Sequence, residues 1–188
     1  NSYINIKKVG LNSRRIGFYQ LMKKFGAKIK FKNIKKMNNE PVGDIVVQSS
    51  KLKPIKASAN FYTSSTDEYP IMFVIAALTK GVSIFRGIED LANKESNRIE
   101  EMKKILKQIG IKCVLKKNEI KIYGSDKKDY TNKIIKVPNL GDHRICMSTV
   151  VLSLITGAKS NINHFETVKT SSPSFLNIIK SLGANYEI

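Results

Sequence analysis

The sequence predicts an α/β (α+β) fold in which buried helices are covered by sheets. Three amphipathic helices, each closed by a glycine and followed by strand-forming residues, recur along the 188 residues. The closing glycines are Gly26, Gly110 and Gly183, so successive copies lie 84 and 73 residues apart. Two further stretches are apolar on nearly every helical face, which is typical of helices inside a core. Regular recurrence of such a unit indicates an internal duplication.

The amphipathic helices are predicted from apolar side chains spaced three and four residues apart. They are expected at residues 18–25, 99–109 and 175–182. Each glycine suits the left-handed position that ends a helix, and the residues after each glycine are expected to enter a strand. A hairpin is expected where residues 113–115 face residues 120–123.

The two buried helices are expected at residues 67–80 and 142–156. Pro70 suits the first turn of the earlier helix, because that turn needs no internal amide donor. Strands are expected to follow at residues 81–85 and around 160–165. The repeating unit is therefore a buried helix, a strand, a loop, an amphipathic helix and a strand.

The first copy of the unit starts directly at a strand, residues 3–9, and lacks its buried helix. The second copy spans about residues 67–124 and the third spans about residues 142–188. We therefore expect residues 1–188 to form a single incomplete domain, about two and a half units long, within a longer protein.

The net charge of +18 is compatible with binding to nucleic acid, to an anionic membrane surface or to small anionic substrates. The lysines are spread over the whole chain, and no aromatic platform or nucleic-acid motif accompanies them. The longest apolar runs are too short to span a bilayer, and no signal peptide is expected. We therefore expect a cytoplasmic protein that binds neither nucleic acid nor membrane. Cys113 and Cys146 are interpreted as buried reduced thiols, and no metal ion or cofactor is expected because only two histidines could join them as ligands.

Charged residues gather at the starts of the predicted helices. Asp67 lies at the start of the first buried helix, where it either caps the helix or presents a carboxylate at the rim of a pocket. Lys94, Glu95 and Arg98 open the second amphipathic helix. Glu95 there fits a solvated first turn, but the helix dipole disfavours the two cations unless an anion binds between them.

Asp142, His143 and Arg144 open the second buried helix. Arg144 needs a partner at an apolar helix, and a carboxylate or phosphate suits its planar fork. One interpretation of His143 is a purely structural role, as a hydrogen-bonding group within the turn. Lys169 occupies the same repeat position as residues 93–98 and is expected to face the same cavity. Together the clusters predict a site for a small, multiply anionic substrate, with proton-transfer groups inside it.

Four ordered motifs resemble the 5-enolpyruvylshikimate-3-phosphate synthases, also called 3-phosphoshikimate 1-carboxyvinyltransferases. They are Asp-Glu-Tyr-Pro at 67–70, Lys-Glu-Ser-Asn-Arg at 94–98, Gly-Asp-His-Arg-Ile-Cys-Met at 141–147 and Thr-Ser-Ser-Pro-Ser-Phe at 170–175. Residues 9–15 and 39–45 resemble the same family, so the likeness covers about residues 4–188 and corresponds to its C-terminal portion.

Four residues depart from the usual pattern of this family, namely Ala92, Asn93, Asn97 and Ser172. The charged residues expected to touch substrate are retained, so the departures concern local support and affinity more than identity. The resemblance implies one domain of a two-domain fold built from βαβαββ units, with substrates held between the domains. No counterpart of the first domain is found in this chain, so we expect the chain alone to be inactive and the full-length protein to be a monomer.

The resemblance also implies a reaction. The carboxyvinyl group of phosphoenolpyruvate would pass to the 5-hydroxyl of shikimate 3-phosphate with release of phosphate, a step of the shikimate pathway and of aromatic amino acid biosynthesis. The residues implied to contact the substrates are Asp67, Lys94, Arg98, Arg144 and, by a looser alignment, Lys169. Arg98 and Arg144 would clamp phosphoenolpyruvate, whereas Asp67 and Lys94 would contact the acceptor. Asp67 and Glu95 are implied to move protons, Asp67 as the base and Glu95 as the candidate donor, although which carboxylate does which transfer stays open.

Three alternatives stay open at this point. The related transferase that acts on UDP-N-acetylglucosamine shares the fold and the phosphoenolpyruvate chemistry, but the Asp-His-Arg and Lys-Glu-Ser signatures favour the shikimate enzyme. A non-catalytic basic domain would bind polyanions such as DNA with a steep dependence on salt. An inactive relative would be consistent with Ala92 and Asn97.

Overall fold

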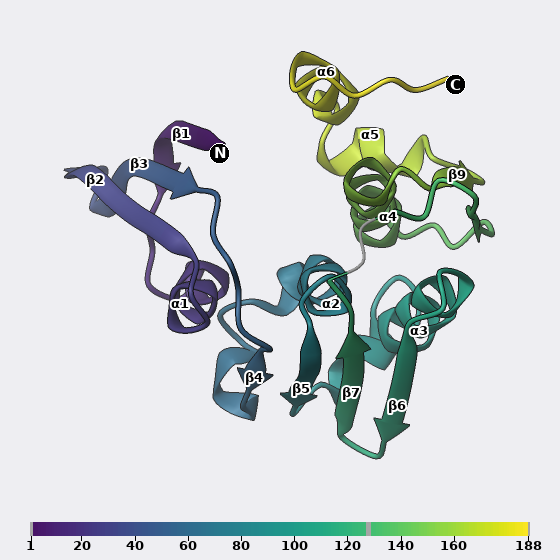
Figure 1. Cartoon of the computed structure of the whole chain (residues 1–188). Coiled ribbons are helices and arrows are strands. Elements are labelled where there is room, and N and C mark those ends of the chain that lie inside the picture. Colours follow the sequence, from purple (N-terminus) through teal and green to yellow (C-terminus); the bar gives the residue numbers. More distant parts are fainter. Residues whose placement is uncertain (1, 127–128, 188) are drawn as a thin grey trace.

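Three sheets lie around a central group of helices in the computed structural model, which describes residues 2–126 and 129–187 (Figure 1). The strands are β1 (Tyr3–Gly10), β2 (Lys28–Met37), β3 (Glu40–Gln48), β4 (Lys56–Ala57), β5 (Gly81–Arg86), β6 (Lys112–Lys116), β7 (Glu119–Gly124), β8 (Ile134–Val137) and β9 (Lys159–Ile162). The α-helices are α1 (Gly17–Lys24), α2 (Tyr69–Ala77), α3 (Arg98–Gln108), α4 (His143–Thr156), α5 (Thr167–Ser171) and α6 (Phe175–Ser181). Three 3₁₀ turns are η1 (Ala59–Phe61), η2 (Thr66–Glu68) and η3 (Glu89–Asn93).

The sheets follow the predicted alternation of helices and strands. The first sheet has the antiparallel order β1-β3-β2. The second has the order β4-β5-β7-β6, with β4 parallel to β5 and the remaining pairs antiparallel. The predicted hairpin is confirmed, because Cys113 pairs with Ile122 and Leu115 with Ile120 across β6 and β7. In the third sheet β8 runs parallel to β9.

Helix α2 forms the centre of the core, as its continuous apolar sequence predicts. Met72, Phe73 and Val74 are consecutive and all 0% exposed, so the helix is covered on successive sides. It packs against β7 of the second sheet and against α3 and α4 (Figure 1). The Tyr69 and Phe85 rings stack edge-on against Phe73 between this helix and the sheet. This packing brings the starts of α2, α3 and α4 close to one another.

The helix ends agree with the predicted glycine caps, since Gly26, Gly110 and Gly183 all have positive φ. The predicted strand after Gly183 is wrong. Residues 184–187 are irregular, because no described strand lies beside them to complete a ladder. The predicted strand 160–165 is shorter than expected, ending at Ile162, and His164 then turns the chain with a positive φ.

Two helix starts also differ from the prediction. The first buried helix begins at Tyr69 instead of residue 67, because residues 66–68 form the separate 3₁₀ turn η2. The segment around Lys169, which the sequence placed at the opening of the last amphipathic helix, forms the additional short helix α5. Pro173 separates α5 from α6, since it lacks the amide donor that a continuous helix needs.

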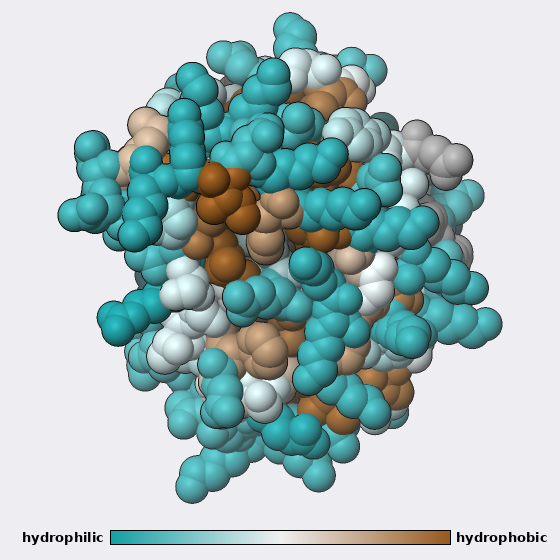
Figure 2. Space-filling view, turned by 90° about the vertical axis from the view of Figure 1, so that its left-hand side faces the viewer, coloured by the Kyte–Doolittle hydropathy of each residue, from teal (hydrophilic) through white to brown (hydrophobic). Residues whose placement is uncertain are grey.

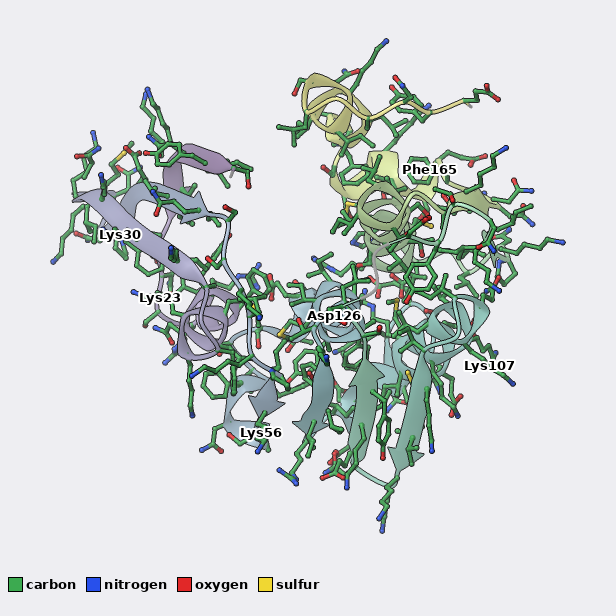
Figure 3. All side chains as sticks on the ribbon, viewed as in Figure 1. Lys23, Lys30, Lys56, Lys107, Asp126 and Phe165 are labelled. Atoms are coloured by element: carbon green, nitrogen blue, oxygen red, sulfur yellow. The ribbon has the colours of Figure 1, made fainter. Side chains whose placement is uncertain are left out.

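The surface carries its positive charge on many elements. Lys23 on α1, Lys30 on β2, Lys56 on β4 and Lys107 on α3 lie at separate places around the molecule (Figure 3). The face in Figure 2 is mostly hydrophilic, with apolar patches between the charged side chains. Several apolar side chains of the first sheet are exposed, namely Tyr3, Ile4, Ile6, Ile34 and Met37. Within the described ranges, no helix has the length and apolar character that crossing a membrane requires.

The contact between β7 and α2 yields a first prediction. A Cβ atom on Gly124 would lie 2.1 Å from the carbonyl oxygen of Ala76 and 2.2 Å from that of Thr79. Gly124→Ala is therefore expected to lower the free energy of unfolding by at least about 2 kcal/mol, because backbone must move to admit the methyl group. Gly10→Ala is the control, since a Cβ atom there meets nothing within 4 Å. Urea denaturation followed by circular dichroism measures both, and equal stability of the two variants would contradict the packing described.

Candidate functional site

A buried arginine joins the starts of three helices. Arg98 is the first residue of α3, and its side chain is 1% exposed. Its Nε donates to Oδ2 of Asp142 at 2.9 Å, and its Nη2 donates to Glu95. Its Nη1 lies 4.0 Å from Oδ1 of Asp67. Because carboxylates from three segments surround one guanidinium group, the buried positive charge is compensated.

Asp142 is the most buried acid of this group, with a side chain that is 0% exposed. Its Oδ1 accepts hydrogen bonds from the backbone N–H groups of Arg144 at 3.0 Å and Ile145 at 3.3 Å, so it caps α4. Its Oδ2 also accepts from the Ser96 hydroxyl at 2.9 Å. Burial raises the pKa of Asp142, but the Arg98 hydrogen bond and charge, with Ser96, outweigh burial and hold the pKa below its usual range. The sequence placed Asp142 at the start of this helix but indicated neither the cap nor the buried pairing.

Asp67 and Arg144 form the accessible part of the cluster. Nη2 of Arg144 lies 3.0 Å from Oδ2 of Asp67, and Nη1 of the same guanidinium donates to the Asp67 carbonyl oxygen at 3.4 Å. The two side chains are 29% and 34% exposed, so a solute can reach both. The helix-cap interpretation of Asp67 is wrong. Glu68 occupies the N-cap of α2 without a side-chain hydrogen bond, and η2 turns the Asp67 carboxylate toward Arg144 and Arg98.

Glu95 lies at the outer edge of the cluster, with its side chain 46% exposed while it accepts from Arg98. Asn97, one of the departures from the family pattern, caps α3 by accepting from the backbone N–H of Glu100 at 3.1 Å. An asparagine serves this capping role well. The substitution therefore leaves the start of α3 supported.

Neither Lys94 nor Lys169 forms a hydrogen bond or ion pair with the acids of the cluster within the described residues. Lys94 precedes α3, so it does not share a helical face with Arg98 as a continuous helix would require. Its Nζ lies 2.6 Å from Oδ2 of Asp90, which also accepts from the Tyr62 hydroxyl at 2.7 Å. Lys169 is exposed on α5 and forms no hydrogen bond or ion pair with another side chain among residues 2–126 and 129–187.

Glu68 is a charged neighbour that the sequence patterns did not single out. Burial raises its pKa, and the charge of adjacent Asp67 raises it further, whereas Arg144 and Arg15 act in the opposite direction. The signal was its place between Asp67 and Pro70 in the Asp-Glu-Tyr-Pro motif.

The cluster combines two functions that one substrate could use together. Arg144 offers hydrogen-bond donors with the planar geometry that carboxylates and phosphates accept. Asp67 and Glu95 place proton-transfer groups on either side of Arg98. The arrangement therefore suits acid–base chemistry on a small anion bound at Arg144.

A family profile and individual relatives both match the chain to the same family. The sequence profile of EPSP synthase (3-phosphoshikimate 1-carboxyvinyltransferase) matches residues 1–179. The 3-phosphoshikimate 1-carboxyvinyltransferase of Zymomonas mobilis is 35% identical over 185 residues, and that of Petrotoga mobilis is 35% identical over 182 residues. Both alignments cover 97% of this chain but 41% of the relative. The chain thus spans about two fifths of the length of the curated relatives it matches.

Solved structures agree with the fold. An EPSP synthase from Acinetobacter baumannii has a TM-score of 0.88 at 29% identity, covering 100% of this chain and 42% of that chain. The enolpyruvyl transferase NikO from Streptomyces tendae has a TM-score of 0.69 at 12% identity, covering 98% and 40%, which supports the fold alone. The predicted α/β fold and the family resemblance are therefore confirmed.

The buried pair yields a second prediction. Asp142→Asn keeps a side chain that can cap α4 but removes the charge that compensates Arg98. We expect it to lower the free energy of unfolding by about 3 kcal/mol, because Arg98 loses its one fully buried carboxylate partner and keeps only the more exposed Glu95 and Asp67. Asp126→Asn is the matched control: the Asp126 side chain is 70% exposed and lies 4.0 Å from Lys80, so its loss is expected to cost less than about 0.5 kcal/mol. Urea denaturation measures both, and a small effect at Asp142 would show that the pair is not needed.

The lowered pKa of Asp142 yields a third prediction. An unfolded aspartate titrates near about pH 3.9. Because the folded pKa is lower, the stability that this carboxylate contributes is present above that pH and is lost as the pH falls through the folded pKa. Urea midpoints are therefore expected to decline below about pH 4 in the parent chain and less steeply in Asp142→Asn. If the urea midpoints of the two proteins declined equally steeply with falling pH, groups other than Asp142 would cause the acid sensitivity.

Proposed function

The chain belongs to the EPSP synthase family, and we propose that it supplies one wall of the site where the carboxyvinyl group of phosphoenolpyruvate passes to the 5-hydroxyl of shikimate 3-phosphate. The convergence of Asp67, Glu95, Arg98 and Arg144 from three helix starts carries this proposal. Because the relatives are more than twice as long, we also propose that residues 1–188 form one incomplete domain. The facing wall then comes from the part of such proteins that this chain does not match.

Arg144 binds the phosphoenolpyruvate anion first in this proposal. Its side chain is 29% exposed, whereas that of Arg98 is 1% exposed. Arg98 joins the clamp when a ligand oxygen replaces Glu95 at Nη2, since Glu95 is its most exposed partner. This exchange keeps the guanidinium charge paired throughout, because Asp142 stays in place.

The same exchange releases Glu95 for proton transfer. Asp67 takes the proton of the acceptor hydroxyl, whose oxygen then bonds to C2 of phosphoenolpyruvate. Glu95, which takes up a proton from solvent once it has left Arg98, delivers that proton to the methylene carbon, and a tetrahedral intermediate results. Phosphate then leaves C2 with the proton held by Asp67, and a proton of the new methyl group returns to Glu95, which restores the double bond. A carboxylate that first donates and then accepts a proton suits this sequence.

The two lysines have supporting places in the proposal. Lys94 contacts the hydroxylated acceptor, and the pairing with Asp90 at 2.6 Å keeps its ammonium group oriented until the acceptor arrives. Lys169 contributes a weaker contact from α5, where its exposed side chain is unpaired among the described residues.

A chimera tests the function directly. Residues 1–188 would replace the matching 41% of the Zymomonas mobilis relative, and phosphate release would be measured with phosphoenolpyruvate and shikimate 3-phosphate. We expect turnover, and we expect Arg144→Ala to lower kcat/KM by roughly ten- to hundredfold through the loss of a charge-assisted contact. Arg86→Ala is the control, because Arg86 pairs with Glu119 on the distant sheet β5–β7.

The outcomes separate the alternatives. Full turnover in the Arg144→Ala chimera would rule out the clamp. Phosphate release with UDP-N-acetylglucosamine in place of shikimate 3-phosphate would assign the chain to the related transferase. A folded chimera that is inactive with both acceptors would support a non-catalytic anion-binding domain.

A further inference from the structure

Two hollows lie between the turn before α1 and the loop before α2, and the smaller one reaches Asp67 of the cluster. Both are lined by Arg14, Thr63 and Ser64, and their volumes are about 380 and 120 Å³. The smaller one is bounded by the turn before α1 and by the loop that leads into α2; its lining consists of Arg14, Arg15, Thr63, Ser64, Ser65, Thr66, Asp67 and Glu68. That volume is well above the roughly 10–15 Å³ that one water molecule needs on the same measure, so a small oxyanion can enter.

The two walls of the smaller hollow are fixed against each other. The backbone N–H of Gly17 donates to the carbonyl oxygen of Ser64 at 3.2 Å. A Cβ atom on Gly17 would lie 2.0 Å from the Ser64 hydroxyl oxygen, so the glycine permits this approach. Ser65 is 1% exposed, and its hydroxyl donates to the carbonyl oxygen of Phe61. The hollow is therefore preorganised, and a ligand would not have to order the loop.

The charges around the hollow leave two cations available. The guanidinium groups of Arg14 and Arg15 form no hydrogen bond or ion pair with another part of the described chain. Asp67 already has Arg144 as a partner at 3.0 Å. Glu68 lies within the influence of Arg144 and Arg15, but burial and the charge of Asp67 still raise its pKa, so it takes up a proton more readily than an ordinary glutamate. Two exposed arginines thus face one acid whose charge is only partly offset.

We propose that this hollow is a second oxyanion subsite, in which Arg14 and Arg15 hold a phosphate group beside Asp67. Paired guanidinium groups match the oxygens of a tetrahedral phosphate. The hydroxyl groups of Ser64, Ser65 and Thr66 donate to backbone carbonyl oxygens, so Thr63 is the lining hydroxyl that can turn toward the anion. The ligand is either free phosphate or the phosphate of a small monoester, since both present the same dianion. This subsite is defined by phosphate binding alone. Phosphate could therefore bind there even if the chain took no part in the proposed carboxyvinyl transfer.

Titration of the chain with inorganic phosphate tests the subsite. Backbone amide shifts would be followed by NMR at constant ionic strength, with glycerol 3-phosphate titrated in parallel. We expect saturable shifts confined to residues 12–17 and 63–68, and the tighter of the two probes identifies the natural source. Arg15→Gln and Arg14→Gln should each weaken binding roughly tenfold or more. Lys24→Gln removes the same charge from the exposed far end of α1 and should leave binding unchanged.

Glu68 provides an opposite test. Glu68→Gln removes the remaining acid of the hollow, so phosphate affinity should rise roughly threefold or more. Shifts that never saturate, or equal losses in Lys24→Gln and Arg15→Gln, would mean that phosphate meets only the general positive charge of the chain. Either result overturns the subsite without touching the proposed transfer reaction, which depends on Arg144 and not on Arg14 or Arg15.

Discussion

The pairing of buried Arg98 with buried Asp142 is the constraint on which the rest of the site depends. A guanidinium group that is 1% exposed survives in a protein interior because carboxylates and hydrogen bonds replace its water. Asp142 fixes it from the start of α4, Glu95 from the approach to α3 and Asp67 from the approach to α2. Arg98 thereby holds the N-terminal ends of α2, α3 and α4 at fixed positions relative to one another. These positions place Arg144 and Asp67 side by side at the accessible edge of the cluster.

The surrounding fold explains why such a point can exist. Helix α2 is apolar on all sides and fills the interior, so the polar groups of three segments meet at one end of the core. Gly124 allows β7 to approach the carbonyl groups at the other end of α2. The positive charge of the chain is carried mainly by lysines on outer elements (Figure 3), whereas the cluster itself pairs two arginines with three acids. Local chemistry in the cluster is therefore set by specific pairs and not by the net charge of +18.

The repeat, the helix type and the clustered charges could be predicted from the sequence, because they depend on local periodicity and on glycine at helix ends. Gly26 and Gly110 end their helices as the pattern indicates. The partners of the charged residues could not be predicted, because they lie on segments far apart in the sequence. The role of Asp67 depended on whether the helix began at residue 67 or 69, and a 3₁₀ turn decided it. Similarly, Lys94 was expected to open the helix together with Arg98, but the helix begins four residues after Lys94, and Lys94 pairs with Asp90.

The long sequence separations within the cluster have a consequence for the order of folding. Arg98 and Asp142 are 44 residues apart, and Arg144 and Asp67 are 77 residues apart. Contacts of this range form after local helices and hairpins, since closing long loops costs entropy that early intermediates cannot recover. We therefore expect these ion pairs to form late, after the transition state for folding. Interactions that form after the transition state slow unfolding and leave the folding rate almost unchanged. On this expectation the cluster contributes to the kinetic stability of the chain.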